Sequence, residues 1–229
     1  MSFEDVIDQD SAIKILKEEL KSERINHAYL FTGKQGVGKK TLAFEFIKSL
    51  LCKNEKNNNC GECINCKRIN HSNHPDVKFI EKEENSNQIK IDQIRALQKE
   101  ISYKPYETDW KVYIIDEADD MTLPAANSLL KILEEPPDYG VIILLAEKID
   151  KLLPTVISRC QQIKLNNISQ ERIIQYIRQQ NQEKEENIDE EKLRLYSLLS
   201  EGSLGRALEL MNNEEFFNKR KEILNIVKE

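Results

Sequence analysis

The stretch HAYLFTGKQGVGKKTLAFEFIKSLLC, residues 27–52, contains the pattern that decides the fold. Residues 27–33 predict a buried strand that ends in glycine, and residues 39–52 predict a helix. Between them, GKQGVGKKT has the glycine spacing of a phosphate-binding loop, in the strand-then-helix context that this motif requires. Backbone N–H groups and the helix N-terminus hold phosphate oxygens in such loops. We therefore predict a nucleotide site at Gly33, Gly36, Val37, Gly38, Lys39, Lys40 and Thr41.

The residue after Lys39 departs from this motif. Phosphate-loop enzymes place a Ser or Thr there, and its hydroxyl coordinates Mg²⁺. Lys40 has no acceptor atom and carries a positive charge, so it cannot ligate a cation. Thr41 comes one residue late, which rotates it by about 100° around a helix. We expect ATP or ADP to bind, Mg²⁺ to lose a ligand, and hydrolysis to be weak or absent.

A second acidic motif, VYIIDEAD, occupies residues 112–119. Four apolar residues followed by two carboxylates put Asp116 at the carboxyl end of a buried strand, where phosphate-loop enzymes carry an aspartate that orients Mg²⁺. Glu117 is then the candidate base for an attacking water. The alternative is a strand that runs into an acidic surface turn.

Strands and helices alternate through the first 166 residues, which predicts an α/β fold with a parallel sheet sandwiched by helices. The expected strands are 27–33, 76–81, 111–118, 140–147 and 161–165. The expected helices between them are 11–21, 39–52, 91–102 and 122–135. After residue 166 the strands cease and four helices follow, at 169–180, 189–200, 203–211 and 214–229. We therefore predict an α/β domain over 1–166 and a small all-α domain over 167–229.

Four of the five cysteines fall within residues 52–66: Cys52 closes the predicted helix over 39–52, and Cys60, Cys63 and Cys66 lie in a polar insertion over 53–75. Four thiolates at such spacing suit a closed, structural zinc site that ties the insertion to the sheet domain. An iron–sulfur cluster is the alternative metal group.

The net charge is −6, and charged residues make up 32% of the 229 residues. A protein that binds DNA by itself is usually basic, so we expect any nucleic-acid role to be shared with partners. The acidic N-terminus lacks the apolar core of a signal peptide, and there is no run of eighteen apolar residues. We expect a cytoplasmic location and no membrane contact.

Several motifs together resemble one family. They are FEDVIDQ, HAYLFTGKQGVGKKT, VYIIDEADDMTLPAANSLLKILEEPP, LPTVISRC and EGSLGRALEL, in this order along the chain. This set is similar to the bacterial clamp-loader subunits of the DNA polymerase III holoenzyme, which are AAA+ ATPases. The resemblance implies a five-stranded AAA+ sheet, a zinc module at the cysteines and a helical lid. The family's further collar domain is expected to be absent from this chain.

The resemblance is closer to the delta-prime type than to the gamma/tau motors. Lys40 replaces a hydroxyl, and Glu147–Lys148 replaces the Thr or Asn with which motors sense the γ-phosphate. The resemblance implies that Arg159 reaches a neighbouring subunit's nucleotide in trans, and that Arg206 contacts nucleotide on the chain's own lid. The residue-level alternatives are a surface arginine paired with an acid and a helix-surface arginine.

The partners that the resemblance implies are gamma/tau and delta clamp-loader subunits, and through them the sliding clamp and primed DNA. The chain would belong to a nucleotidyltransferase complex, with little ATPase activity of its own. One alternative is an active gamma/tau-like motor, which Lys39, Asp116 and Glu117 favour. Another is a zinc-bearing nucleic-acid-binding module, which the net negative charge disfavours.

Overall fold

The computed structural model describes residues 3–55, 58–183 and 189–212. The chain forms two compact units. The first contains residues 1–33 and 39–165, and the second contains residues 34–38 and 166–229.

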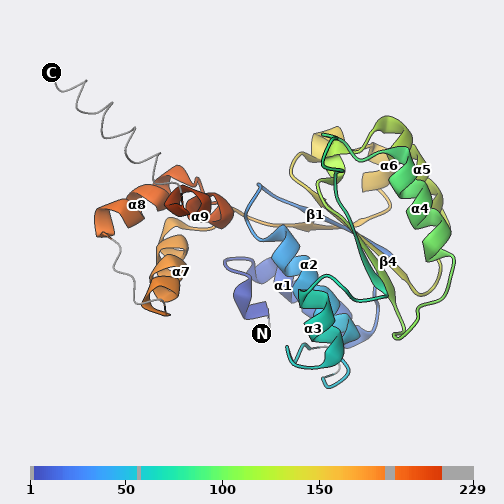
Figure 1. The fold of residues 1–229 in the computed structure, drawn as a ribbon, viewed down its shortest axis with the longest axis horizontal. Helices are drawn as coiled ribbons and strands as arrows, with labels where there is room; N and C mark the ends of the chain where they lie inside the picture. The colour runs from blue at the N-terminus through green and yellow to red at the C-terminus, as the bar shows by residue number, and fades with distance from the viewer. Residues whose placement is uncertain (1–2, 56–57, 184–188, 213–229) are drawn as a thin grey trace. The chain divides into compact units, whose positions relative to one another are not determined.

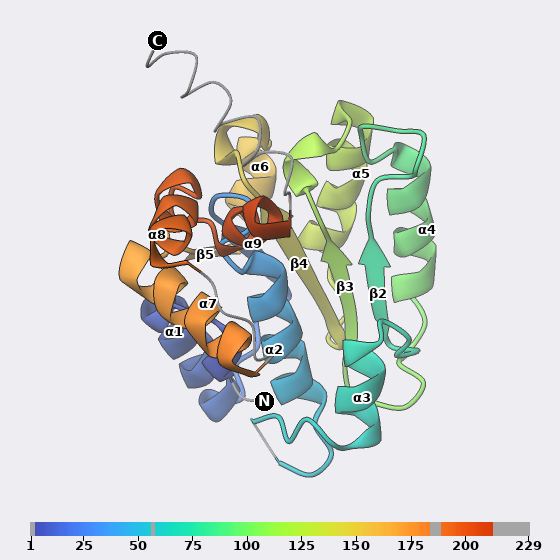
Figure 2. The same ribbon diagram turned by 60° about the vertical axis from the view of Figure 1, so that its left-hand side comes forward.

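The first unit is built on one parallel sheet of five strands in the order β2-β3-β4-β1-β5 (Figure 2). The strands are β1 (Ala28–Thr32), β2 (Val77–Ile80), β3 (Lys111–Ile115), β4 (Gly140–Ala146) and β5 (Gln161–Lys164). β1 pairs with both β4 and β5, whereas the chain after β1 continues to β2 at the far edge. Ligands of such sheets bind at the carboxyl ends of the strands, next to this change of direction.

Helices cover both faces of the sheet (Figure 1). The helix pair α4 and α5 lies with α6 on one side, and α1, α2 and α3 lie on the other. The bounds are α1 (Asp10–Ser22), α2 (Lys39–Leu51), α3 (Ile64–Asn70), α4 (Ile91–Ile101), α5 (Leu123–Glu134) and α6 (Pro154–Ile157). Three short 3₁₀ segments, η1 (Phe3–Asp5), η2 (Ala118–Asp120) and η3 (Ile149–Lys151), complete this unit.

Alternation along the strands explains why the sheet needs helices on both faces. Leu30 belongs to the buried cluster that includes Leu97 of α4 and Leu129 of α5. The next residue back, Tyr29, points to the opposite face, where its ring lies 5.0 Å from that of Phe46 in α2. Because helices cover both faces of the sheet, the central strands are buried along nearly their whole length and consist mainly of apolar residues, as the sequence predicts.

Local signals set the ends of α5. The Thr122 side chain accepts a hydrogen bond from the N–H of Ala125, which caps the first turn. Pro124 stands in that turn, where no N–H is needed, and Pro136 follows the last helical residues. The predicted helix over 122–135 is thereby confirmed.

Helix α3 was not expected, because residues 53–75 have the composition of a polar insertion. It spans only seven residues, too few for a helical hydrophobic period to be visible. Its N-cap is Cys63, whose sulfur accepts a hydrogen bond from the N–H of Cys66. The helix therefore depends on the cysteines rather than on an apolar stripe.

The second unit is helical in its described part. It contains α7 (Gln170–Glu183), α8 (Glu190–Leu199) and α9 (Leu204–Asn212). The fourth helix predicted for this region, 214–229, lies outside the described residues. Together with the sheet, these helices confirm the predicted fold class of a parallel α/β sheet followed by a small helical lid.

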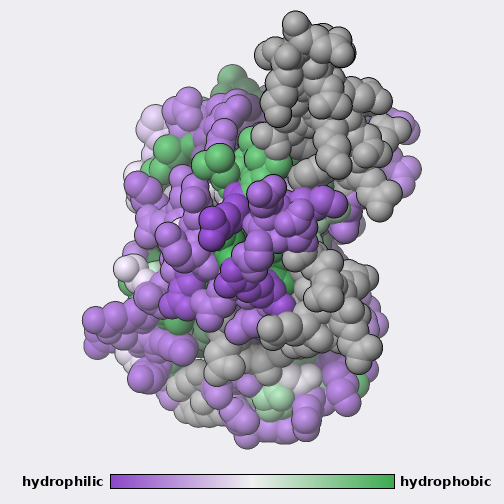
Figure 3. Space-filling model, turned by 90° about the vertical axis from the view of Figure 1, so that its left-hand side faces the viewer, coloured by the Kyte–Doolittle hydropathy of each residue, from purple (hydrophilic) through white to green (hydrophobic). Residues whose placement is uncertain are grey.

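The face of the molecule in Figure 3 is mainly hydrophilic, with small separate hydrophobic areas, as the charged composition predicts. Among the described residues, no helix combines the length and apolar character needed to cross a membrane.

Candidate nucleotide site and metal centre

Two glycines shape the loop that joins β1 to α2. Gly36 has a φ of 76° and Gly38 a φ of 101°, in the left-handed region that favours glycine. A side chain at Gly38 would meet nothing within 4 Å, so its backbone conformation is what requires glycine there. Val37, between them, is buried and donates its N–H to the carbonyl of Lys34 over 3.4 Å. The loop has the curled backbone with which phosphate-binding loops direct N–H groups at an anion.

Lys39 begins α2 and turns back over the loop. Its Nζ donates to the carbonyl of Gly33 at 2.6 Å, and Gly33 in turn donates its N–H to Ala146 at the end of β4. Burial lowers the pKa of Lys39, and the nearby carboxylates of Glu147 and Asp116 partly offset this effect. The lysine therefore lies at the carboxyl edge of the sheet, where it can meet a phosphate.

Lys40 lies against two carboxylates. Its Nζ is 2.5 Å from Oε1 of Glu81 and 3.4 Å from Oδ2 of Asp116. Burial alone would lower the pKa of Lys40, but the two acids outweigh it and hold the pKa above its ordinary value. Thr41 is exposed on the next position of the helix. The loop's hydroxyl is absent, and an ammonium group pairs with the aspartate instead.

Asp116 and Glu117 lie directly after β3, as predicted, but each already has partners. Oδ1 of Asp116 accepts the N–H of Glu117 at 3.0 Å, and its other oxygen pairs with Lys40. Glu117 has a left-handed backbone, with φ 49°, and its carboxylate is 3.0 Å from Nζ of Lys82. Glu117 is therefore part of an ion pair in this structure.

The sequence did not single out four residues that lie at this edge, namely Glu81, Lys82, Asp119 and Asp120. Lys82 also binds Asp120 at 2.6 Å, and the Asp119 carboxylate accepts the N–H groups of Glu147 and Lys148 at 3.2 and 3.0 Å. The signal that could have found Glu81 and Lys82 is their position directly after β2, the strand that pairs with β3. Carboxyl ends of neighbouring parallel strands meet at one edge.

Mg²⁺ does not fit these residues. A magnesium ion needs nearly octahedral oxygen ligands at about 2.0–2.1 Å and keeps several waters. Lys40 offers no oxygen, and its ammonium group lies within 3.4 Å of the Asp116 oxygen that a metal would need. A nucleotide fits better, because Lys39 presents its ammonium group at this edge of the sheet, at the start of α2.

Arg159 follows α6 and is partly exposed. Its Nη2 is 2.9 Å from Oε1 of Glu134, at the end of α5, and its Nη1 donates to the carbonyl of Thr155 at 2.9 Å. Within this chain the guanidinium is thus paired with an acid. Its role toward a neighbouring subunit stays a prediction.

Arg206 lies in α9, in the second unit, together with residues 34–38. Its N–H donates to Oγ of Ser203 at 3.1 Å, and its guanidinium is 3.9 Å from Glu201. Within the same unit, the N–H of Gly205 donates to the carbonyl of Gly36 at 3.0 Å. A contact between Arg206 and nucleotide stays a prediction.

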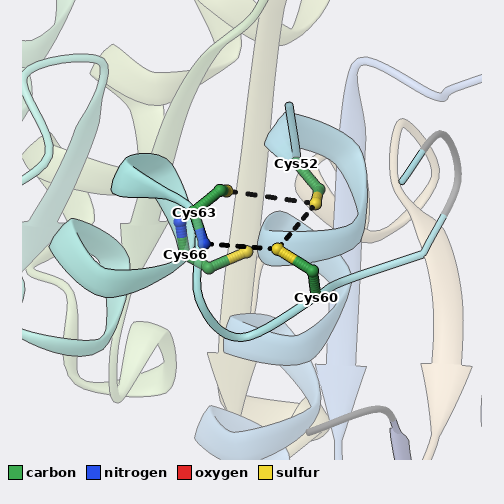
Figure 4. Close-up of side chains that lie close together, drawn as sticks. All are labelled: Cys52, Cys60, Cys63 and Cys66. Carbon is green, nitrogen blue, oxygen red and sulfur yellow. Dashed lines mark hydrogen bonds between the residues drawn. The ribbon is translucent and has the colours of Figure 1, made fainter. Parts of the chain in front are cut away.

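The four clustered cysteines come together as a candidate metal centre (Figure 4). All four sulfur atoms lie within 4.8 Å of one another, with Cys52–Cys60 at 3.6 Å and Cys52–Cys63 at 4.0 Å. A tetrahedral ion with metal–sulfur bonds of about 2.3 Å separates its sulfurs by about 3.8 Å. The spacing therefore suits one ion held by four thiolates.

Backbone N–H groups point at these sulfurs. Cys63 donates its N–H to the sulfur of Cys60 at 3.2 Å, and Cys66 donates to that of Cys63 at 3.5 Å. Burial alone would raise the pKa of Cys63, but the hydrogen bonds that its sulfur accepts from the N–H groups of Cys66 and Lys53 help to lower it to about 6. Burial raises the pKa of Cys66, the innermost of the four. The N–H groups favour thiolate at Cys63, the form that binds a metal.

Buried polar groups join this centre to α2. Glu45 and Lys48 pair at 2.5 Å with almost no exposed surface, and Asn59 donates to Glu45 at 2.8 Å. Asn65 of α3 donates to the carbonyl of Leu51 at 2.7 Å. The insertion is thereby fastened to the same helix that begins with Lys39 and Lys40.

The comparisons with known proteins agree with this geometry. A family model described as DNA polymerase III, delta subunit, matches residues 8–169. The chain belongs to this delta-subunit family. This chain is 37% identical to the DNA polymerase III subunit delta' of Bacillus subtilis over 222 residues. The matched region covers 95% of this chain and 64% of that relative.

The delta-subunit family member is also 32% identical to the DNA polymerase III subunit tau of Bacillus subtilis, over 94% of this chain and 38% of that protein. It therefore spans less than two thirds of either relative. Among solved structures, the RuvB Holliday junction branch migration motor of Thermotoga maritima matches 99% of this chain and 66% of its own, with a TM-score of 0.61 and 16% identity. That likeness concerns the fold alone, and it agrees with the predicted parallel α/β sheet followed by helices.

Proposed function

We propose that this chain is a delta-prime-like subunit of the bacterial clamp loader. It assembles with gamma/tau and delta subunits, and through the complex helps load the sliding clamp on primed DNA. It hydrolyses little or no ATP itself and contributes Arg159 to the nucleotide of a neighbouring motor. A cytoplasmic location, with the chromosome, follows from this role.

The observation that carries the proposal is Lys40. Its ammonium group pairs with Asp116 in the place where a motor needs a hydroxyl and a metal. The lysine removes hydrolytic chemistry, yet the loop, the sheet and the family relationship are all retained. A subunit of this kind can still serve a ring of motors by supplying a cationic side chain in trans.

Arg159 has the accessibility that such a role requires. Its side chain is 35% exposed and, among the described residues, pairs with the carboxylate of Glu134, whose side chain is 52% exposed. An exposed pair of this kind contributes only about 0–1 kcal/mol, so a phosphate from a neighbour can compete for the guanidinium. Planar guanidinium groups bind phosphate oxygens in bidentate fashion.

The experiment is Arg159→Ala in a complex reconstituted with gamma/tau and delta subunits. All motor sites except the one next to this chain carry a disabling change in their own phosphate-loop lysine. Arginine fingers contribute about 10³–10⁵ in rate, so we expect hydrolysis at the remaining site to fall by about 10³ while assembly persists. The measurement is steady-state release of phosphate in the presence of clamp and primed DNA.

Arg178→Ala is the matched control, because Arg178 is also exposed and paired with a glutamate, Glu190, at 2.7 Å. We expect it to leave turnover unchanged. The second candidate function, an active gamma/tau-like motor, is favoured by Lys39, Asp116 and Glu117. If that alternative holds, Arg159→Ala leaves turnover at wild-type level, whereas Glu117→Gln lowers it.

We assign zinc to the cysteine centre as a structural ion. The four sulfurs are too close together to surround several iron atoms, and four protein ligands leave no open position for chemistry.

A further inference from the structure

The two residues after β2, Glu81 and Lys82, hold the charged groups of the nucleotide site in an ion-pair network. Glu81 binds Lys40 at 2.5 Å, and Lys82 binds Glu117 at 3.0 Å. Ile80 and Ile115 are paired across β2 and β3, so the two residues after each strand emerge side by side. The register of this strand pair therefore brings three acids, Glu81, Asp116 and Glu117, and one lysine, Lys82, to the same edge. Lys40 reaches them from α2.

Within this network, Lys40 is surrounded by negative charge. Its Nζ lies between the carboxylates of Glu81 and Asp116, and it is 5.9 Å from the centre of the Phe79 ring, whose face also attracts cations. These neighbours hold the pKa of Lys40 above its ordinary value despite burial. At neutral pH the site thus contains a fixed single positive charge next to Asp116.

Lys82 gives Glu117 a similar constraint. Its ammonium group lies 2.6 Å from Asp120 and 3.0 Å from Glu117, and the hydrogen bonds that it donates to these two carboxylates raise its pKa. Lys151 adds a further positive charge at 3.2 Å from Asp120. Both acids of the expected hydrolytic pair, Asp116 and Glu117, are therefore neutralised by lysines of the chain itself.

We propose that this site binds a nucleoside di- or triphosphate without a divalent metal, with Lys40 as the resident cation that replaces Mg²⁺. Lys39 and Lys40 are adjacent at the start of α2 and bring two positive charges to this edge of the sheet, where phosphate oxygens can accept hydrogen bonds from them. A metal complex of the nucleotide brings a second cation toward Lys40 and gains no oxygen ligand in return. The free nucleotide is therefore the preferred ligand. This inference rests on the proposed function, because it describes the mode in which a non-hydrolysing subunit uses its loop.

The experiment measures the dissociation constants of ATP and ADP by calorimetry, in excess EDTA and in excess Mg²⁺, with the intact chain. For the wild type we expect Mg²⁺ to leave the dissociation constant unchanged or to raise it. For Lys40→Thr, which restores a hydroxyl and frees Asp116, we expect Mg²⁺ to tighten binding about tenfold.

A second experiment uses Mn²⁺ alone, and Mn²⁺ with ADP, as a direct probe of a metal site, since electron paramagnetic resonance detects Mn²⁺ that the protein immobilises. We expect the wild type to immobilise no Mn²⁺.

Lys78→Thr is the matched control. Lys78 lies on β2, the strand that Glu81 follows. Its side chain is 47% exposed against 45% for Lys40, and it pairs with Glu100 at 3.8 Å. We expect it to behave as the wild type. Glu81→Gln is a second variant that keeps Lys40 and removes its closest partner. We expect it to bind free nucleotide more tightly than the wild type and still to gain nothing from Mg²⁺.

Three results would overturn the inference: wild-type binding that Mg²⁺ tightens tenfold or more, Mn²⁺ immobilised by the wild type, or no binding of nucleotide in either condition. None of these touches the role of Arg159, which the reconstituted complex tests separately. A loss of motor turnover in Arg159→Ala, together with no nucleotide binding here, would leave the proposed function standing and remove only this inference.

Discussion

Asp76 has no exposed surface, yet it is a carboxylate. It lies just before β2 and accepts the N–H groups of Tyr106, Glu107 and Thr108 at 2.6, 2.9 and 3.1 Å, as well as the Thr108 hydroxyl. Burial alone would raise the pKa of Asp76, but these hydrogen bonds outweigh it and lower the pKa below its ordinary value. One side chain thus holds the loop that leads from α4 to β3.

We expect Asp76→Asn to lower the free energy of unfolding by about 2 kcal/mol at neutral pH, because an amide NH₂ cannot accept the N–H bonds. The folded pKa is depressed, so the carboxylate stabilises the fold fully above the ordinary value of 3.8, and this contribution is lost as the pH falls toward the folded pKa. Urea unfolding at several pH values measures both effects. Asp92→Asn, at a side chain that is 86% exposed, is the control and should change little. Equal stability of Asp76→Asn and wild type at neutral pH would contradict this account.

At the scale of elements, the metal centre joins α2 and α3. Cys52 follows the last residue of α2, Cys63 caps α3, and Cys66 lies inside α3. Cys60 comes from the segment between them. A metal ion would therefore fix the end of one helix to the start of another, which the short α3 cannot achieve through apolar packing alone.

We expect about one equivalent of zinc per purified chain and much less in Cys63→Ser. Loss of the ion exposes the α3 amides to hydrogen exchange and lowers Tm. Even ~2 kcal/mol of lost stability corresponds to about 4–8 °C for a chain of this size. Elemental analysis, exchange and calorimetry measure these quantities. Cys160→Ser is the control, since Cys160 lies outside the cluster. Less than about half an equivalent of zinc in the wild type would count against the assignment. Iron in place of zinc would instead indicate that the cysteines hold an iron group.

At the scale of the whole molecule, charge limits what the chain can do alone. It has 40 acidic and 34 basic residues, a net charge of −6. Phosphate contacts need Lys and Arg in excess, and at the nucleotide site the lysines already pair with acids. Any contact with DNA is therefore expected to depend on partner subunits.

We expect the isolated chain to bind primed DNA more weakly than ~10⁻⁴ M at physiological salt, the weak end of non-specific protein–DNA affinity. Fluorescence anisotropy with labelled primed DNA measures this, and the reconstituted complex is the positive control. Micromolar binding by the isolated chain, falling steeply with added salt, would instead support an independent nucleic-acid-binding module.

The sequence by itself determined most of the strands and long helices of this protein and the chemical identity of its motifs, but not the short helices α3 and α6. Apolar runs predicted the central strands, glycine spacing predicted the curled loop, and cysteine spacing predicted the metal centre, because each signal lies within a short segment. The absence of a loop hydroxyl was likewise visible at Lys40.

Only the tertiary structure decided which groups neutralise one another. Glu81 is 41 residues from Lys40. The pairing of β2 with β3 puts Glu81 beside Asp116, and α2 contacts β2 through the stacked rings of Phe44 and Phe79, which brings Lys40 to both acids. The pairing of Arg159 with Glu134 depends in the same way on the packing of α6 against α5. Electrostatic partners follow distance in space, and distance in space is set by strand order and packing rather than by local sequence.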